Sequence, residues 1–295
     1  MTTGDARSAA ASGNRMRFGV TVFLTDYSID PAELAREVEA RGFTSMWTPE
    51  HTHIPVSRKT PPPMGEPLPK QYYHCLDPFV ALSYAAAATK TLRIGTGICL
   101  VAQHDPIALA KTIATLDHLS GGRFDFGVGF GWNQDEMEHH GVPYAKRREM
   151  VKDRVKAIQA LWTNEQGSYD GEFTKFEASF SWPKPKQEPY PPIYIGGEGG
   201  PRLFKHVAEW ADGWIPIGGR GIRNKLPQLR AEYEKVGRDP DSIKVIPFGS
   251  LPDQGKLEYF ASFGIEEIVL GVDPGGRDTV LPILDRYAKE IASFV

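Results

Sequence analysis

The residues best suited to chemistry follow a short apolar run at positions 45–49. Glu50, His51 and His53 stand there within the sequence Glu-His-Thr-His. A carboxylate beside imidazoles could move protons, and a His-x-His pair could also begin a zinc or iron site. A metal site of that kind needs further ligands after later strands, where apolar residues, proline and glycine stand instead. We therefore expect no metal and give Glu50 and His51 the candidate catalytic roles.

A glycine-rich segment at positions 124–131 is the second notable feature. Gly127, Gly129 and Gly131 alternate there, followed by Trp132 and a run of polar residues. Alternating glycines let a planar ligand or another backbone approach closely. Crowding inside a closed barrel explains the same spacing equally well.

A third feature is the sequence Gly196-Gly197-Glu198-Gly199-Gly200-Pro201, which follows an apolar run. A glycine turn leading into a helix presents free backbone N–H groups and the positive end of the helix dipole, which suit a phosphate. A turn needed only for its geometry is the alternative. The segment has no Walker lysine, so a nucleoside triphosphate fits poorly. No Gly-x-Ser-x-Gly turn is present either, which disfavours a serine hydrolase.

Alternating strands and helices must position these residues. Asp30-Pro31, Asp77-Pro78 and Asp105-Pro106 each provide an N-cap followed by a proline suited to the first turn of a helix. Eight apolar runs are expected to be strands, at residues 16–23, 45–49, 93–101, 124–130, 192–196, 213–217, 244–249 and 267–272. Helices are expected at 31–41, 79–88, 106–120, 144–162, 201–210, 222–236 and 279–294. This order predicts an α/β fold, a (β/α)8 TIM barrel with insertions after strands two and four, and an active site beyond the carboxyl ends of the strands.

Composition limits the classes of partner. The 295 residues carry a net charge of -3 and are 41% hydrophobic, without a run of about 20 apolar residues that could span a membrane. We expect a small-molecule substrate and neither nucleic acid nor membrane as partner. Two cysteines fit a reducing, cytoplasmic location. Residues 1–15 are expected to be a disordered leader, and residues 16–295 a single barrel domain.

A site with histidines and aromatic residues but without an evident nucleophile suits a protein that holds a cofactor. At these residues the sequence resembles the bacterial luciferase-like monooxygenase superfamily, in particular its branch of oxidoreductases that use the deazaflavin coenzyme F420. The resemblance covers residues 16–287. Its motifs are the residues at 47–51, 93–97, 113–117, 120–142, 191–201 and 211–214.

The resemblance implies roles for individual residues. The cofactor ring would lie in the barrel mouth beside His51, with Glu50 nearby and with Gly129 and Trp132 among the cofactor-binding residues. A non-proline cis peptide is implied at Gly97-Ile98, against the ring, and the phosphate site matches Gly197, Glu198, Gly199 and Gly200. The sugar-phosphate dehydrogenases of this superfamily have a glutamate where this chain has Trp132, which disfavours that substrate class.

These observations predict an F420-dependent oxidoreductase that transfers a hydride between F420 and a small organic substrate. The alternative is an FMN-dependent luciferase-like monooxygenase that uses reduced flavin and oxygen. A third possibility is a barrel that only carries flavin. Lys146, Arg147 and Arg148 could attract the acidic tail of F420 or form a solvated helix face. The resemblance also implies a homodimer built on the helices around strands two to four.

Overall fold

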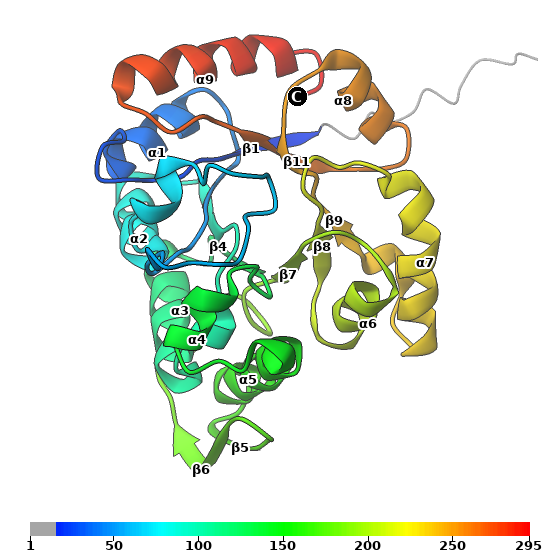
Figure 1. The fold of residues 1–295 in the computed structure, drawn as a ribbon. Helices are drawn as coiled ribbons and strands as arrows, with labels where there is room; N and C mark the ends of the chain where they lie inside the picture. Colours follow the sequence, from blue (N-terminus) through cyan, green and yellow to red (C-terminus); the bar gives the residue numbers. More distant parts are fainter. Residues whose placement is uncertain (1–15) are drawn as a thin grey trace, which may run out of the picture.

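A computed structural model describes residues 16–295 (Figure 1), so the leader expected at residues 1–15 lies outside the described residues. The strands are β1 (Arg17–Thr21), β2 (Ser45–Thr48), β3 (Arg93–Thr96), β4 (Phe124–Val128), β5 (Gln166–Asp170), β6 (Lys175–Phe180), β7 (Ile193–Gly196), β8 (Gly213–Ile215), β9 (Lys244–Val245), β10 (Phe248–Ser250) and β11 (Glu267–Gly271). The α-helices are α1 (Pro31–Ala40), α2 (Pro78–Ala88), α3 (Pro106–Ser120), α4 (Gln134–His139), α5 (Arg147–Thr163), α6 (Pro201–Trp210), α7 (Ile222–Lys235), α8 (Gln254–Ala261) and α9 (Arg277–Ile291). Short 3-10 helices are η1 (Lys70–Tyr73), η2 (Val101–Gln103), η3 (Tyr144–Lys146) and η4 (Pro240–Ser242).

One parallel sheet organises the fold. Within residues 16–295 it has nine strands in the order β10-β11-β1-β2-β3-β4-β7-β8-β9. Its two end strands, β9 and β10, are separated in sequence only by Ile246 and Pro247. Backbone hydrogen bonds continue across this break, from Ile246 N to Trp214 O and from Val269 N to Pro247 O. The sheet therefore curls round on itself, and the prediction of an α/β fold with a parallel curled sheet is confirmed.

The Asp-Pro pairs begin helices as expected. Asp30 accepts hydrogen bonds from the first turn of α1, Asp77 caps α2 through Val80 N, and Asp105 caps α3 through Ala108 N. In each helix proline occupies the first turn, where a backbone N–H would have no intrahelical partner. Gly121 ends α3 with a φ of 76°, the left-handed conformation that glycine adopts at low cost.

Several expected boundaries are wrong. The strand expected at 244–249 is divided into β9 and β10, because Pro247 has no N–H to donate to the sheet. The strand expected at 93–101 ends at Thr96, and the one expected at 124–130 ends at Val128. The excursion with short strands expected at 169–190 does contain two strands, β5 and β6, which pair as an antiparallel hairpin, but β5 already begins at Gln166. Helix α8, capped by Asp253, was not expected at all.

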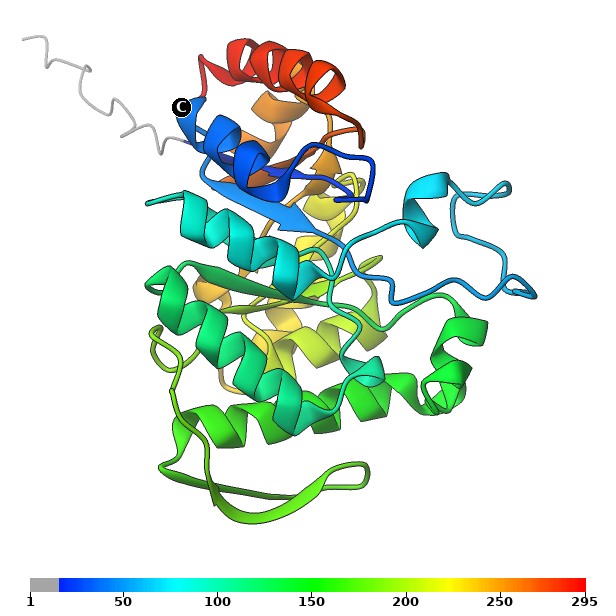
Figure 2. The same cartoon turned by 90° about the vertical axis from the view of Figure 1, so that its left-hand side faces the viewer.

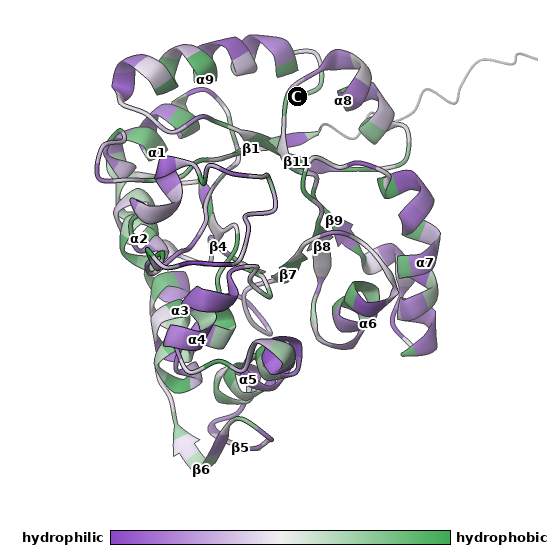
Figure 3. Ribbon diagram, in the orientation of Figure 1, coloured by the Kyte–Doolittle hydropathy of each residue, from purple (hydrophilic) through white to green (hydrophobic). Residues whose placement is uncertain are grey.

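The helices cover the outside of the sheet, and their apolar faces point inward (Figures 1 and 3). A smaller apolar cluster fills the interior of the curled sheet, where the Trp47 ring lies edge-on to Phe248 at 5.8 Å. This cluster fills the space enclosed by the curled sheet. None of the helices between residues 16 and 295 combines the length and the apolar character that crossing a bilayer requires.

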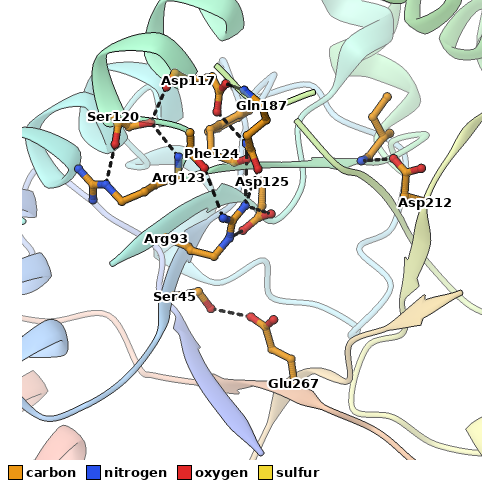
Figure 4. Close-up of polar contacts among 12 residues, drawn as sticks. Ser45, Arg93, Asp117, Ser120, Arg123, Phe124, Asp125, Gln187, Asp212 and Glu267 are labelled. Carbon is orange, nitrogen blue, oxygen red and sulfur yellow. Dashed lines mark hydrogen bonds and ion pairs between the residues drawn. The ribbon is translucent and has the colours of Figure 1, made fainter. Parts of the chain in front are cut away.

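A polar network lies at the amino-terminal ends of the strands (Figure 4). Arg93 forms two hydrogen bonds to buried Asp125, of 2.6 and 2.7 Å. Asp117 is fully buried and accepts hydrogen bonds from Lys186 N and from the backbone and side chain of Gln187. This network ties the segment after the β5–β6 hairpin to the sheet. Polar residues at this end of such a fold serve stability, because the chemistry lies at the opposite end.

Candidate active site

A cavity of about 690 Å³ opens at the carboxyl ends of the strands. Residues from the segments after β1, β2, β3, β4, β7, β8, β10 and β11 line it, as is usual for active sites in parallel barrels. The loop at residues 49–76 contributes Pro63, Gln71 and Tyr72 to the lining and lies on the same side of the molecule as α4 (Figure 2). Most of the residues expected at the site line this cavity, namely Glu50, His51, Gly97, Ile98, Gly129, Trp132, Gly197 and Glu198. Gly199 and Gly200 do not.

Both carboxylate oxygens of Glu50 accept hydrogen bonds from other residues of the protein. Its carboxylate accepts hydrogen bonds from Leu100 N at 2.5 Å and from His104 Nε2 at 2.6 Å, and the residue is only 3% exposed. Burial alone would raise the pKa of Glu50, but His104 and Leu100 N more than offset it, so the pKa is lowered. The same pairing raises the pKa of His104 against the effect of burial. The charged forms of Glu50 and His104 therefore stabilise each other, and Glu50 holds the chain after β3 in place through Leu100 N.

His51 has a carboxylate partner of its own. Its Nδ1 lies 2.8 Å from Oε2 of Glu136, which is 1% exposed and comes from α4. The other carboxylate oxygen of Glu136 accepts a hydrogen bond from Thr52 N at 3.3 Å. Because ionised carboxylates only accept hydrogen bonds, Nδ1 of His51 carries a proton, and Nε2 is left for a ligand in the cavity.

Aromatic rings form one wall beside His51. The Tyr72 ring centroid lies 4.8 Å from that of Phe23, 5.2 Å from that of His51 and 6.2 Å from that of Trp132. Trp132 lies 5.9 Å from His51 as well. Burial raises the pKa of Tyr72, so its hydroxyl stays protonated and can donate a hydrogen bond. This wall suits a flat or apolar ligand.

The glycines around Ile98 are explained by protein neighbours. A Cβ on Gly129 would lie 2.3 Å from Ile98 Cδ1, and one on Gly196 would lie 2.7 Å from Ile98 Cγ2. The Ile98 side chain thus sits between two strands at the cavity floor, and the peptide Gly97-Ile98 is cis, as the resemblance implied. Contact with the Ile98 side chain is enough to explain why position 129 is glycine. The packing therefore gives no separate reason to expect that Gly129 makes room for a cofactor ring.

The turn before α6 is held from inside the barrel. Trp214 Nε1 donates a hydrogen bond to Gly197 O at 2.8 Å. A Cβ on Gly199 would lie 2.6 Å from the Trp214 ring and 2.7 Å from Phe204, so Gly199 is required for packing. A Cβ on Gly200 would meet no atom within 4 Å. Gly200 can therefore be substituted as a test without the clash that Gly199 would produce.

A basic residue completes this end of the cavity. Arg148, like Gly197, lines the cavity, its Nη1 is buried without a hydrogen-bond partner, and its guanidinium stacks on Phe130 at 4.3 Å. Burial and the neighbouring Arg202 and Arg147 lower its pKa. The other two basic residues of this run point to protein partners, because Lys146 pairs with Glu172 and Arg147 stacks on Tyr144.

One group of possible metal ligands lies next to the cavity. Donor atoms of Glu50, Cys99 and His104 lie within 4.8 Å of one another. Burial raises the pKa of Cys99 well above its usual value, and Glu50 raises it further. A thiol that remains protonated is a poor ligand, and both oxygens of Glu50 already have partners. This cluster does not fit a metal ion.

Sequence reasoning did not pair Glu136 with His51. It named Arg148 together with Lys146 and Arg147 as candidates for the acidic tail of F420, but it did not distinguish Arg148 as the one that lines the cavity. Asn133 with Glu136 three residues later is a helix-start pattern, and Asn133 does cap α4. That pattern predicts the helix but not the partner of Glu136, since 85 positions separate it from His51. The cavity contact of Arg148 likewise depends on how α5 is placed.

The family model for luciferase-like monooxygenases matches residues 9–251. The chain belongs to the luciferase-like monooxygenase family. The resemblance inferred from the sequence is therefore confirmed, and the F420-dependent enzymes to which it pointed are among the relatives and the structural neighbours.

Among curated relatives of this luciferase-like protein, the uncharacterized protein Rv0953c of Mycobacterium tuberculosis is 42% identical over 285 residues, covering 95% of this chain and 100% of the relative. F420-dependent glucose-6-phosphate dehydrogenase of Kineococcus radiotolerans is 28% identical, covering 72% of this chain and 60% of that protein. Monooxygenase RslO1 from Streptomyces bottropensis has a similar structure, with a TM-score of 0.76, 20% identity and coverage of 95% and 98%. An F420-dependent secondary alcohol dehydrogenase in complex with an F420-acetone adduct has a TM-score of 0.72, 18% identity and coverage of 95% and 99%.

Proposed function

We propose that this chain is an F420-dependent oxidoreductase that transfers a hydride between coenzyme F420 and a small organic substrate. The observation that carries the proposal is a cavity lined both by His51, whose Nδ1 pairs with Glu136, and by Arg148 together with Gly197 of the turn before α6. An enzyme of this kind must bind a planar ring, anchor a phosphate and exclude water from one face of the ring. When bound, F420 supplies the ring carbon that gives or takes the hydride.

The residues present fit such a cofactor at both ends. The buried, unpartnered Nη1 of Arg148 offers a charged donor to a phosphate, and the first turn of α6 offers free backbone N–H groups. The Ile98 side chain, with Gly129 and Gly196 on either side, provides an apolar surface against which a ring can rest. Glu198 belongs to the outer rim of this end, where it pairs with Lys225.

His51 is the residue we assign to proton handling at the reacting centre. Its protonated Nδ1 is held by Glu136, so Nε2 can accept a hydrogen bond from a substrate hydroxyl or, when protonated, donate one to a carbonyl. Glu136 acts through His51 by fixing its ring and its tautomer. Glu50 positions the segment after β3 through Leu100 N, and we assign it no proton transfer.

The substrate that this cavity favours is small, uncharged and carries an alcohol or carbonyl. The aromatic wall of Phe23, Tyr72 and Trp132 supports this, since it offers no ion pair to a second phosphate. The secondary alcohol dehydrogenase found as a structural neighbour acts on a substrate of this kind, according to its acetone adduct.

The alternative is an FMN-dependent monooxygenase, which the likeness to monooxygenase RslO1 supports. Turnover assays distinguish the F420-dependent oxidoreductase from the FMN-dependent monooxygenase. We expect purified protein to change the absorbance of F420, oxidised or reduced, with secondary alcohols or ketones as substrates. Oxygen consumption with reduced FMN and the same compounds, without any F420 reaction, would favour the alternative. Tight binding of F420 without turnover across substrates would instead indicate a carrier.

We also propose a homodimer built on the outer faces of α2 and α3. Val80 and Tyr84 on α2 are each 60% exposed, Ile107 on α3 is 47% exposed, and the two helices pack side by side. Exposed apolar side chains on neighbouring helices are typical of an interface.

We take the curled sheet as a closed (β/α)8 barrel with insertions at 49–76 and 164–191. Its two free cysteines fit a cytoplasmic location.

A further inference from the structure

Three histidines gather at the surface beside the cavity mouth, away from the groups assigned above. His53 belongs to the loop at residues 49–76, whereas His139 and His140 lie at the end of α4. His53 Nε2 lies 2.9 Å from His139 Nδ1, and the two rings are stacked with centroids 5.1 Å apart and an interplanar angle of 15°. Both residues are exposed, and their contact joins the loop to α4, two segments that lie on the same side of the molecule (Figure 2).

The hydroxyl of Thr52 lies between the rings of His53 and His140 and links the tautomer of one ring to that of the other. Thr52 Oγ1 lies 3.0 Å from His53 Nδ1 and 2.7 Å from His140 Nε2. A hydroxyl has one hydrogen, so it satisfies both rings by donating to one and accepting from the other. When it donates to His140 and accepts from His53 Nδ1, the Nε2 atom of His53 is left with a free lone pair that faces His139. Metal-binding histidines are usually held in this way by a hydrogen bond at the second ring nitrogen.

The distance between the two facing nitrogens suits a shared metal ion. Zn–N bonds of about 2.0–2.1 Å in tetrahedral geometry place two nitrogens about 3.3 Å apart. The observed 2.9 Å is a hydrogen-bond distance between the two rings, so a bound ion would replace that hydrogen bond, and rotation of the two exposed side chains would open the separation of the nitrogens and turn both toward the ion. Imidazole nitrogen is a preferred ligand of Zn²⁺, Ni²⁺ and Cu²⁺, and water can fill the other positions.

The loop is already held in place for such a site. Asp135 accepts hydrogen bonds from Thr60 N at 3.0 Å and Thr60 Oγ1 at 2.6 Å, and Glu136 accepts one from Thr52 N. These contacts fix the loop against α4 on both sides of His53. A pair of ligands held in advance loses less conformational freedom when the ion binds.

We propose that His53 Nε2 and His139 Nδ1 form a binding site for a divalent transition-metal ion, and that the ion clamps the loop at residues 49–76 to α4. The same loop carries Tyr72 in the cavity wall, and α4 carries Glu136, so a bound ion links two parts of the cavity rim. The proposal concerns metal binding alone and stands independently of which cofactor the cavity takes.

The test is calorimetric titration of untagged, EDTA-treated and dialysed full-length protein with ZnCl₂. We expect one ion per chain in the wild type and at least a tenfold loss of association constant in both His53→Ala and His139→Ala. Thr52→Val should lose about 10–100-fold, as expected when an outer hydrogen bond to a metal-binding histidine is removed. His118→Ala, which removes an exposed histidine from α3, is the matched control and should bind as the wild type does.

Hydrogen exchange provides the second measurement. Zn²⁺ should slow exchange of the backbone amides at residues 52–62 in the wild type and in His118→Ala, and leave them unchanged in His53→Ala. Equal thermal unfolding of all variants in EDTA checks that each one folds. Wild-type-like affinity in both His53→Ala and His139→Ala would overturn the proposal, and so would absence of binding to the folded wild type.

Discussion

Glu136 Oε2 lies 2.8 Å from His51 Nδ1, although 85 positions separate the two residues in the sequence. The contact brings a buried carboxylate from α4 to a histidine that follows β2. A carboxylate in this position fixes the tautomer and orientation of the imidazole, as in other acid–base pairs. Both residues line the cavity, but His51 keeps Nε2 for a ligand, whereas the two carboxylate oxygens of Glu50 are engaged with Leu100 N and His104.

Replacing Glu136 tests this pair. Glu136→Leu should lower kcat by about 100-fold, because His51 loses the partner that fixes its tautomer, and general acid–base groups contribute about 10²–10⁴-fold. The Kd of the cofactor should change little, and Glu136→Gln should recover part of the rate. Glu138→Gln changes another carboxylate of α4 and should leave kcat unchanged. A rise in KM with unchanged kcat in Glu136→Leu would mean that Glu136 only shapes the loop.

Arg148 offers a test of the phosphate end. Arg148→Met should weaken F420 binding by about 10–100-fold, since charge-assisted hydrogen bonds contribute about 1.5–3 kcal/mol. Binding of the deazaflavin fragment that lacks the phosphate should not change. Arg147→Met is the matched control, because the Arg147 guanidinium stacks on Tyr144 and does not line the cavity. Equal loss for the whole cofactor and the fragment would refute the phosphate assignment.

His206 should make stability depend on pH. Burial, with Arg148 nearby, lowers the pKa of His206 to about 4, whereas an unfolded histidine titrates near 6.5. Between these values the unfolded chain binds more protons, so stability present above pH 6.5 is lost as the pH falls toward 4.

His206→Gln keeps an acceptor for Trp210 Nε1 and removes the titration. The free energy of unfolding in urea should therefore fall between pH 7 and 5 by about 1 kcal/mol more in the wild type than in the variant. The full pKa shift of His206 would correspond to a larger change in the free energy of unfolding. The expected change is smaller because the His206 side chain is partly exposed and solvent screens its charge. Parallel curves for the two proteins would show that His206 carries no such coupling.

The proposed homodimer is tested by sedimentation equilibrium. Wild-type protein should be dimeric at micromolar concentration, and Tyr84→Glu should shift it to monomer, because a charge would be buried at the α2–α3 face. Tyr259→Glu on α8 makes the same substitution at an exposed tyrosine on another helix and should remain dimeric. A monomeric wild type would remove the dimer from this account.

Local rules predicted much of the fold. The Asp-Pro caps and the spacing of apolar runs placed most helices and strands, since capping and side-chain periodicity depend on neighbouring residues. Pro247 could also have predicted the break between β9 and β10, because proline cannot donate to a sheet.

Residues that meet only in the folded chain limited the prediction of the site. The histidines after β2 were found because polar residues follow strands at one end of such a fold. The carboxylate partner of His51 was not predicted from the sequence. Gly199 was assigned to phosphate binding, although the nearest neighbours of a Cβ at this position are the rings of Trp214 and Phe204. Glycine spacing does not distinguish room for a ligand from room for another side chain.

The proposed function depends most on the identity of the cofactor. Fluorescence titration of the purified, cofactor-free protein with F420, and in parallel with FMN, measures it directly. We predict saturable binding of F420 at one site per chain, at least tenfold tighter than binding of FMN. Tight binding of FMN with no binding of F420 would contradict the central claim.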